Sequence, residues 1–289
     1  MITTRALALA SIVGFAVMLG AAVYATDGPM HIRGLGFQVW KFISGKAHGG
    51  QFFSANNVSI YYETYGAGPA VLVLHGGLGS LEGMSYQIRA LAKSHFVIAA
   101  DSRGHGQSTD SDSPLSYPLM SDDMWKLLEH LQVDRVDVVG WSDGGIIGLD
   151  LAMRHPERIR RLVAISANYD VDGLRESPIL DSEVPRAPLR YRLFAQDPIH
   201  WPALYRKVVK MWQTKPHYTL NDLGHKAPTL IMAGEFDIIK PEHSAQLAKA
   251  IPGGQEVIIR GATHAVPVEK PVVVNCRILR FLDYDNRSE

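Results

Sequence analysis

The segment 140–144 reads Gly-Trp-Ser-Asp-Gly and has the pattern G-x-S-x-G, with Ser142 at its centre. It follows the apolar, β-branched run 136–139 and precedes an amphipathic helical pattern at 146–153. A serine at such a strand-to-helix corner is held in a strained backbone conformation that exposes its hydroxyl. The flanking glycines keep side chains out of the tightest part of the turn. The pattern therefore predicts Ser142 as the nucleophile of an acyl-transfer reaction.

A nucleophilic serine needs a base and a group that orients the base. In one common chain order, the acid and the histidine both follow the serine. Here Asp237 lies in a loop after the apolar run 229–234, and His264 lies in a loop after the strand pattern 256–259. Loops at the carboxyl ends of strands gather at one edge of an open α/β sheet. We therefore expect Asp237 to orient His264, and His264 to act as the base.

The tetrahedral oxyanion of acyl transfer needs preorganised hydrogen-bond donors. The apolar strand pattern 70–74 runs into His-Gly-Gly-Leu-Gly at 75–79, a glycine-rich turn that can present bare backbone N–H groups. We predict that the N–H groups of Gly77 and Asp143 form the oxyanion hole. A structural hydrogen bond that holds the turn is the favoured role of His75, and donation to substrate is the alternative.

These motifs together resemble the α/β-hydrolase family over about residues 52–282. The segment 100–108, Ala-Asp-Ser-Arg-Gly-His-Gly-Gln-Ser, is similar to the D-x-R-G-x-G-x-S loop found after the fourth strand of many members. The resemblance implies an α/β fold with a mostly parallel, eight-stranded sheet flanked by helices and an inserted helical cap. A serine at the nucleophile position argues against the dehalogenase and epoxide-hydrolase branches. The longer form Gly-Trp-Ser-Asp-Gly-Gly is similar to the biphenyl-hydrolase-like serine hydrolases that cleave amino-acid esters.

The implied enzyme is an esterase-like or lipase-like serine hydrolase. It would cleave a carboxylic ester, or a related thioester, lactone or amide, of a small molecule through an acyl-enzyme intermediate and without a metal or organic cofactor. Other members of this fold bind ligands without catalysis, and others cleave carbon–carbon bonds, perform perhydrolysis or remove residues from small peptides. These functions remain the alternatives.

Two acidic side chains have alternative interpretations. The Asp143 carboxylate is expected to cap the N-terminus of its own helix. The sharper hypothesis, which rests on the amino-acid-ester resemblance, is that it receives a substrate ammonium group. Glu235 is the nearest competitor of Asp237 for the role of orienting the base. Asp101 and Arg103 are expected to tie loops together rather than to contact substrate.

The chain divides into three parts. Residues 1–25 are a targeting or anchoring segment, 26–51 are read as a linker that partly packs on the domain, and 52–289 form the hydrolase domain. Within that domain, strand and helix patterns alternate, which favours a mostly parallel sheet. The two opening strands, joined by the turn-prone Asn56-Asn57, are expected to form an antiparallel edge.

The segment 171–227 interrupts the alternation and is too long for a simple connection, so we expect it to be a cap over the site. Apolar residues at helical spacing from 201 to 212 are expected to fasten a cap helix to the body, and lining the acyl pocket is the alternative. Seven basic residues and one acidic residue lie between 186 and 215, which favours a solvated face or weak attraction of anionic substrates or a membrane. The candidate substrate-binding residues of the turn, the elbow and the cap are His75, Leu78, Trp141, Trp201 and Trp212.

Composition limits the function classes. The chain has 289 residues, 46% of them hydrophobic, which suits one globular domain of substantial size. Its 29 basic and 29 acidic residues give a net charge of +0, so nothing indicates a nucleic-acid partner. The 12 histidines show no metal-ligand spacing. The single cysteine, Cys276, permits no intramolecular disulfide and is expected to be a small core residue.

The N-terminus has the features of an export signal. A short start with one basic residue is followed by the uncharged run 6–25, and Val23-Tyr24-Ala25 offers a small-residue cleavage site before Thr26. The run is long for a signal peptide and nearly long enough to span a bilayer, so an uncleaved membrane anchor is the alternative. Either interpretation predicts export to the periplasm or the medium. The sequence carries no signal for an oligomeric state.

Overall fold

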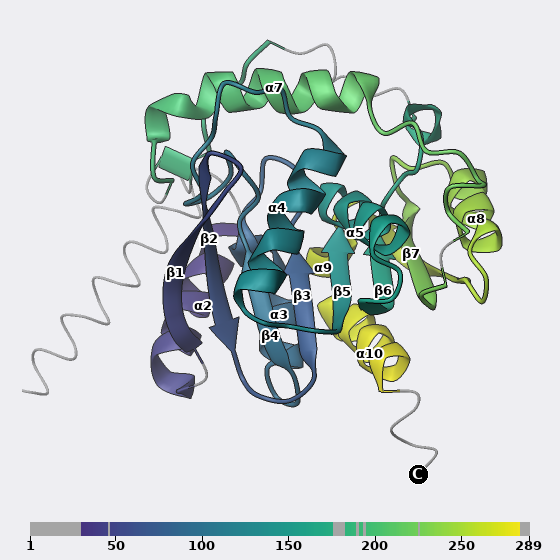
Figure 1. Cartoon of the computed structure of the whole chain (residues 1–289), viewed down its shortest axis with the longest axis horizontal. Coiled ribbons are helices and arrows are strands. Elements are labelled where there is room, and N and C mark those ends of the chain that lie inside the picture. Colours follow the sequence, from purple (N-terminus) through teal and green to yellow (C-terminus); the bar gives the residue numbers. More distant parts are fainter. Residues whose placement is uncertain are drawn as a thin grey trace, which may run out of the picture.

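The computed structural model describes residues 30–45, 47–175, 183–188, 191–192, 195–224 and 226–283. Figure 1 shows a central sheet with helices on both faces and one long helix across one end. The strands are β1 (Ala47–Ala55), β2 (Val58–Tyr65), β3 (Ala70–Leu74), β4 (Phe96–Ala100), β5 (Val136–Trp141), β6 (Ile159–Ile165), β7 (Thr229–Phe236) and β8 (Gln255–Thr263). The α-helices are α2 (Met30–Ser44), α3 (Ser85–Leu91), α4 (Tyr117–His130), α5 (Asp143–Arg154), α7 (Trp201–Thr214), α8 (Pro241–Ala250), α9 (Val266–Glu269) and α10 (Pro271–Leu282).

The eight strands form one sheet in the order β1-β2-β4-β3-β5-β6-β7-β8. The pairs β1–β2 and β2–β4 are antiparallel, and every other pair is parallel. The predicted α/β-hydrolase architecture, with its antiparallel edge and mostly parallel sheet, is therefore confirmed. Because β3, β5, β6, β7 and β8 are parallel, the loops that follow them meet at one end of the sheet.

Apolar side chains cover both faces of the central strands, which explains their continuous apolar runs. Leu72 and Val138 pack in one layer together with α4, α5 and α8. Val71 and Val139, which alternate with them along the strands, pack in the opposite layer with α3 and α10. The sheet is thus buried on both sides, and its strand ends are fixed in position relative to one another.

The segment predicted as a linker, 26–51, contains the helix α2 and the start of β1, which begins at Ala47 rather than at Phe52. Phe37 is completely buried, and its ring lies 5.6 Å from the ring of Trp40 and 5.9 Å from that of Tyr65. The described part of this segment packs on the domain, as expected, but it forms a helix and part of a strand rather than an irregular linker. Its glycines favoured the prediction of a linker, but packing of aromatic rings on β2 stabilises a helix.

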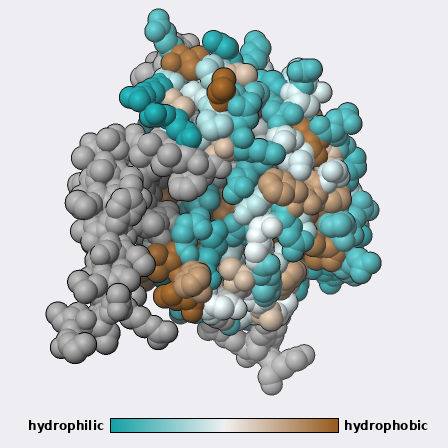
Figure 2. All heavy atoms as spheres, turned by 90° about the vertical axis from the view of Figure 1, so that its left-hand side faces the viewer, coloured by the Kyte–Doolittle hydropathy of each residue, from teal (hydrophilic) through white to brown (hydrophobic). Residues whose placement is uncertain are grey.

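The outward side of α2 carries exposed apolar side chains. Phe42 is 91% exposed, and Val39 and Ile43 are also exposed. The view onto this side of the molecule shows a mainly hydrophilic surface on which hydrophobic residues form separate groups (Figure 2). Among the described residues, no helix is both long and apolar enough to cross a membrane. The uncharged run 6–25 lies outside the described residues.

Cys276 is exposed on α10, which corrects the expectation that it is a core residue. The buried face of this helix consists of Val274, Ile278, Phe281 and Leu282. Val272, which lies about one turn before Cys276 on the same helix, is also exposed (81%). Several faces of the helix are apolar, and packing against α3 selects the one that is buried.

The inserted segment between β6 and β7 carries α7, which lies across the end of the sheet toward which β3 and β5 run (Figure 1). Its residues Trp201, Leu204, Val208 and Met211 are buried, as expected for a stripe that fastens a cap helix to the body. Outside the helix, Asp110 accepts hydrogen bonds from Lys207 and His200 of the cap. The cap is thus held to the body by both apolar and charged contacts.

Candidate active site

Ser142 occupies the corner between β5 and α5, as the sequence predicts. Its backbone has φ 54° and ψ −119°, a left-handed conformation that is costly for a residue with a side chain. The corner is held by the Ser142 N–H, which donates to Ile165 O at 2.8 Å, and by the Ser142 carbonyl, which accepts from Gly145 N–H at 2.8 Å. These contacts keep the strained residue in place at the end of the strand.

The two glycines of the G-x-S-x-G pattern are required by close backbone approaches. A Cβ atom at Gly140 would lie 2.1 Å from the carbonyl oxygen of Gly144. A Cβ atom at Gly144 would lie 2.5 Å from the carbonyl oxygen of Leu74. Both distances are far below van der Waals contact, so any side chain there would force the backbone apart. The predicted reason for the two glycines is thus correct.

The structure brings together Ser142, His264 and Asp237 from three separate loops. His264 Nε2 lies 3.0 Å from Ser142 Oγ, and His264 Nδ1 lies 2.7 Å from Asp237 Oδ1. Trp141 Nε1 donates to the His264 carbonyl oxygen at 2.8 Å, which fixes the backbone of the histidine. Glu235, the alternative orienting acid, instead accepts a hydrogen bond from Gly261 N–H.

Asp237 is buried and surrounded by hydrogen-bond donors. Burial opposes its ionisation, but His264 and the donors around it outweigh that effect and hold the pKa of Asp237 below its usual value. The Ser166 hydroxyl donates to Oδ2 at 2.5 Å, and Ile239 N–H donates to Oδ1 at 3.1 Å. Ser166 itself has a positive φ of 52°. No sequence pattern indicated that Ser166 supports the acid.

The glycine-rich turn after β3 lies directly against Ser142. A Cβ atom at Gly76 would be 3.2 Å from Ser142 Cβ, and one at Gly77 would be 2.4 Å from Asp143 Oδ2. Among the described residues, the N–H groups of Gly77 and Asp143 have no protein acceptor. Asp143 is also the first residue of α5, where backbone N–H groups are free of helical bonds. Both predicted oxyanion donors are therefore available beside the serine.

The Asp143 carboxylate does not cap its own helix, contrary to the expectation. Its Oδ1 accepts hydrogen bonds from Tyr117 OH at 3.0 Å and from Trp212 Nε1 at 2.9 Å. Its Oδ2 is buried and has no hydrogen-bond partner. Burial raises the pKa of Asp143 to about 6, although the Trp212 and Tyr117 hydrogen bonds lower it. The carboxylate thus joins the cap, through Trp212, to α4, through Tyr117.

His75 and the loop after β4 have structural roles. His75 Nδ1 lies 2.7 Å from the Gly76 carbonyl oxygen, and its Nε2 accepts from Ser102 N–H at 3.0 Å. Asp101 accepts hydrogen bonds from two backbone N–H groups, and Arg103 forms a buried ion pair with Asp123. These contacts confirm that the three residues tie loops together.

A cavity of about 240 Å³ opens beside Ser142. Its walls combine the three site loops with both ends of the cap. They consist of Gly76, Gly77, Tyr117, Trp141, Ser142, Asp143, Asn168, Leu174, Arg175, Trp212, Lys215, Ile238, Ile239 and His264. The cavity is therefore the place where a small substrate can meet the serine.

Of the five candidate substrate-binding residues, Trp141 and Trp212 line this cavity. His75, Leu78 and Trp201 are not among the wall residues of this cavity, so their contact with substrate stays a prediction. Trp201 faces the interior of the cap, because its Nε1 donates to Pro185 O at 2.8 Å and its ring packs edge-on against Tyr191.

No sequence pattern pointed to most of the remaining wall residues. Ile238 and Ile239 directly follow Asp237, so their proximity to the site could have been anticipated. Tyr117 and Arg175 come from distant positions in the chain and reach the cavity only through the tertiary fold. Over the described residues, no group of three or more His, Cys, Asp or Glu side chains is arranged to hold a metal ion.

Comparison with known proteins identifies the family of this chain. A family model of the alpha/beta hydrolase fold matches residues 69–198. A putative carbamate hydrolase, RutD of Azorhizobium caulinodans, is 30% identical over 81% of this chain and 97% of its own length. The chain belongs to the α/β-hydrolase fold family.

Other relatives agree with this assignment. The human serine hydrolase BPHL is 33% identical over 70% of this chain and 75% of its own length. A putative lipase from Acinetobacter baumannii has the same fold, with a TM-score of 0.74 and 19% identity over 91% of this chain and 98% of its own. As an α/β-hydrolase with such relatives, the chain has a hydrolytic function.

Proposed function

We propose that this α/β-hydrolase cleaves a carboxylic ester of a small molecule through an acyl-enzyme intermediate. The observation that carries the proposal is the continuous chain of contacts from Ser142 Oγ to His264 Nε2 at 3.0 Å and from His264 Nδ1 to Asp237 Oδ1 at 2.7 Å. Strained backbone at Ser142 holds the hydroxyl at one end of this chain. Relatives named as a serine hydrolase and as an esterase support the same reading.

The protonation of the histidine follows from the state of the acid. Asp237, whose pKa is held low, is ionised at neutral pH and can only accept hydrogen bonds. His264 Nδ1 therefore carries the ring proton and donates it to Asp237. The other ring nitrogen, Nε2, is left as an acceptor that faces the Ser142 hydroxyl. This is the tautomer that a general base requires.

The reaction then proceeds in two halves. His264 takes the proton of Ser142 as its oxygen attacks the ester carbonyl, and the N–H groups of Gly77 and Asp143 stabilise the oxyanion. Collapse of this intermediate breaks the bond to the alcohol, which leaves with the proton from His264. A water molecule, deprotonated by His264, attacks the acyl group, releases the acid and returns the proton to Ser142.

The size of the cavity limits the substrate. A volume of about 240 Å³ is below the usual range for drug-sized ligands, so we expect a small acyl group rather than a long chain. The apolar walls formed by Trp141, Leu174 and Ile238 suit the carbon skeleton of such a group. Esters are favoured over amides only by analogy with the esterase relatives, and carbamates, thioesters and lactones belong to the same reaction class.

Hydrolysis of a series of 4-nitrophenyl esters by the full chain tests the proposal. We expect short acyl chains to be cleaved and Ser142→Ala to lower kcat/KM by at least about 10³-fold, because the acyl-enzyme can no longer form. A fluorophosphonate probe should label the wild type and not the variant. Ser54→Ala, at an exposed position of β1, serves as the matched control and should retain full activity.

Absence of both hydrolysis and labelling in the wild type would contradict the proposal and favour a ligand-binding function. Hydrolysis that survives in Ser142→Ala would also contradict it, because another group would then act as the nucleophile.

A further inference from the structure

Two basic side chains, Arg175 and Lys215, line the cavity beside Ser142. They come from the two ends of the cap, since Arg175 follows β6 and Lys215 follows α7. Both side chains are exposed. Within the described part of the chain, neither forms an ion pair with an acidic residue. Two cations therefore face the same small cavity, and neither is directly paired with a carboxylate of the described residues.

The backbone at both ends of the cap is tied to the body, which fixes where these side chains start. Arg175 N–H donates to Ile238 O at 2.8 Å, and the preceding residue forms a β-bridge with Ile239. A second bridge joins Asp170 to His217, two residues after Lys215, and the Asp170 carboxylate lies 2.9 Å from His217 Nδ1.

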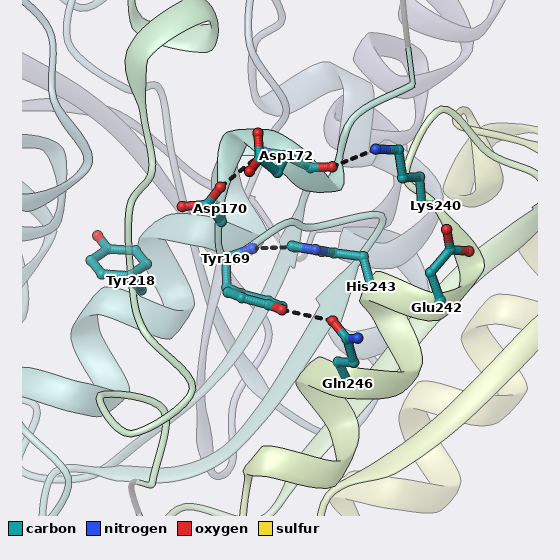
Figure 3. Close-up of a pocket in the computed structure, with 8 residues that line it drawn as sticks. All are labelled: Tyr169, Asp170, Asp172, Tyr218, Lys240, Glu242, His243 and Gln246. Atoms are coloured by element: carbon teal, nitrogen blue, oxygen red, sulfur yellow. Dashed lines mark hydrogen bonds between the residues drawn. The ribbon is translucent and has the colours of Figure 1, made fainter.

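Contacts in a neighbouring pocket of about 380 Å³ reinforce this arrangement (Figure 3). Tyr169 N–H donates to His243 Nε2 at 3.0 Å, and the two rings stack 3.8 Å apart. Lys240 Nζ donates to the carbonyl oxygen of Asp172 at 2.7 Å. Residues 169–172 are therefore fastened to α8, so the cap end that leads to Arg175 has a fixed course.

Asp143 is the acidic side chain of the cavity wall, and it forms an ion pair with neither cation. Its carboxylate is buried and bonded through Oδ1 to Tyr117 and Trp212. Like charges that converge on one cavity repel each other and lower the energy of an anion placed between them.

We propose that Arg175 and Lys215 form an anion-binding edge of the cavity and that the preferred substrate is a small ester bearing a carboxylate or phosphate group. Its carbon skeleton would lie against the apolar wall, and its charged group would lie at the mouth between the two cap ends. The proposal rests on the proposed ester hydrolysis. It opposes the alternative in which Asp143 receives a substrate ammonium group, because that cation would face the two basic residues.

Matched ester pairs that differ only in charge test this proposal. 4-Acetoxybenzoate and its methyl ester place the charge on the alcohol side, and mono-4-nitrophenyl adipate and its methyl ester place it on the acyl side. 4-(2-Aminoethyl)phenyl acetate supplies the cationic alternative. We expect the anionic member of at least one pair to have a several-fold higher kcat/KM, and this preference should fall as salt concentration rises.

Replacement of the two basic residues should remove the preference. The double variant Arg175→Gln, Lys215→Gln is expected to lower kcat/KM for the favoured anionic ester about tenfold, as for the loss of charge-assisted hydrogen bonds at a partly exposed site. Activity on its neutral partner should change less than about twofold, which shows that the fold and the serine are intact. Lys210→Gln is the matched control, because Lys210 is an exposed cation of α7 outside the cavity wall.

The proposal is overturned if neither pair shows a preference, if the cationic ester is the best substrate, or if the double variant loses anionic and neutral activity equally. In those cases the proposed function survives as long as a neutral ester is cleaved and Ser142→Ala abolishes its cleavage. Absence of hydrolysis of every ester, together with absence of fluorophosphonate labelling, would overturn both.

Discussion

Two adjacent residues at the elbow have opposite surroundings. Ser142 is strained but reaches the cavity, whereas the Asp143 carboxylate is 2% exposed and shielded by Tyr117 and Trp212. Burial raises the pKa of Asp143 to about 6, more than its two hydrogen bonds lower it. At neutral pH the folded protein therefore holds a charge in a place where water solvates it poorly.

This makes a prediction for Asp143→Asn. Because the pKa of Asp143 in the folded protein exceeds the ordinary aspartate value, the folded protein binds the proton more tightly between about pH 4 and pH 6. The wild type should lose stability as pH rises through this window, and the loss is absent in the neutral variant. From pH 4 to pH 7, the free energy of unfolding of the variant should rise relative to the wild type by up to about 3 kcal/mol. Urea unfolding at four pH values measures it.

Tyr117→Phe provides a second variant for the same prediction. It removes a hydrogen bond that lowers the pKa of Asp143, so the loss of stability should extend to higher pH than in the wild type. A difference between Asp143→Asn and the wild type that stays constant across the pH range would show that Asp143 does not titrate there.

At the residue level, the sequence predicted the groups whose motifs are local. Ser142 stands in a pentapeptide, and the glycines around it have steric reasons that can be read from the pattern. The surroundings of Asp143 could not be predicted, because its partners lie 26 and 69 residues away along the chain. The position of Arg175 in the cavity wall could not be predicted either, because it depends on β-bridges that form only in the folded cap.

Secondary-structure elements were predictable where the spacing of apolar residues agreed with the residues that begin and end helices and strands. The alternation of apolar strands and amphipathic helices predicted the sheet and placed the loops that carry Asp237 and His264. The prediction failed for α2, because its glycines are typical of a linker, and for Cys276, because a helix with several apolar faces does not reveal which one is buried. In both cases tertiary packing decides the outcome.

The cap helix α7 is held to the body through Asp110, which lies 2.8 Å from Lys207 Nζ and 2.7 Å from His200 Nε2. Burial opposes ionisation of Asp110, but its hydrogen bonds to Lys207, Ser111 and His200 keep its pKa below the usual value. Lys207→Gln removes the positive charge that offsets the cost of burying the ionised Asp110 carboxylate. We therefore expect faster amide hydrogen exchange over 201–214 and unchanged exchange in β3 and β5.

Lys210→Gln again serves as the control for the cap, because its ammonium group is exposed on the same helix. Its exchange over 201–214 should match that of the wild type. Equal protection in the two variants would show that the apolar stripe alone fastens α7.

At the scale of the whole molecule, the site is assembled from loops after β3, β5, β7 and β8 and is closed by the insertion after β6. The parallel sheet brings these loops to one end, and the cap adds the wall residues that no motif encodes. The site loops carry sequence motifs and the cap does not. The reaction class can therefore be predicted from the sequence, whereas the substrate depends on how the cap folds.

The N-terminal run 6–25 lies outside the described residues, and its role stays a prediction. We expect it to direct export and to be removed before Thr26, because Val23-Tyr24-Ala25 places small residues where a signal peptidase cleaves. The full chain, expressed in a Gram-negative host, should yield a periplasmic protein whose intact mass corresponds to residues 26–289. Ala25→Leu should block the cut and leave a longer product in the membrane fraction. Recovery of the wild type with its first residues intact, in membranes that resist carbonate extraction, would show instead that the uncharged run is a permanent anchor.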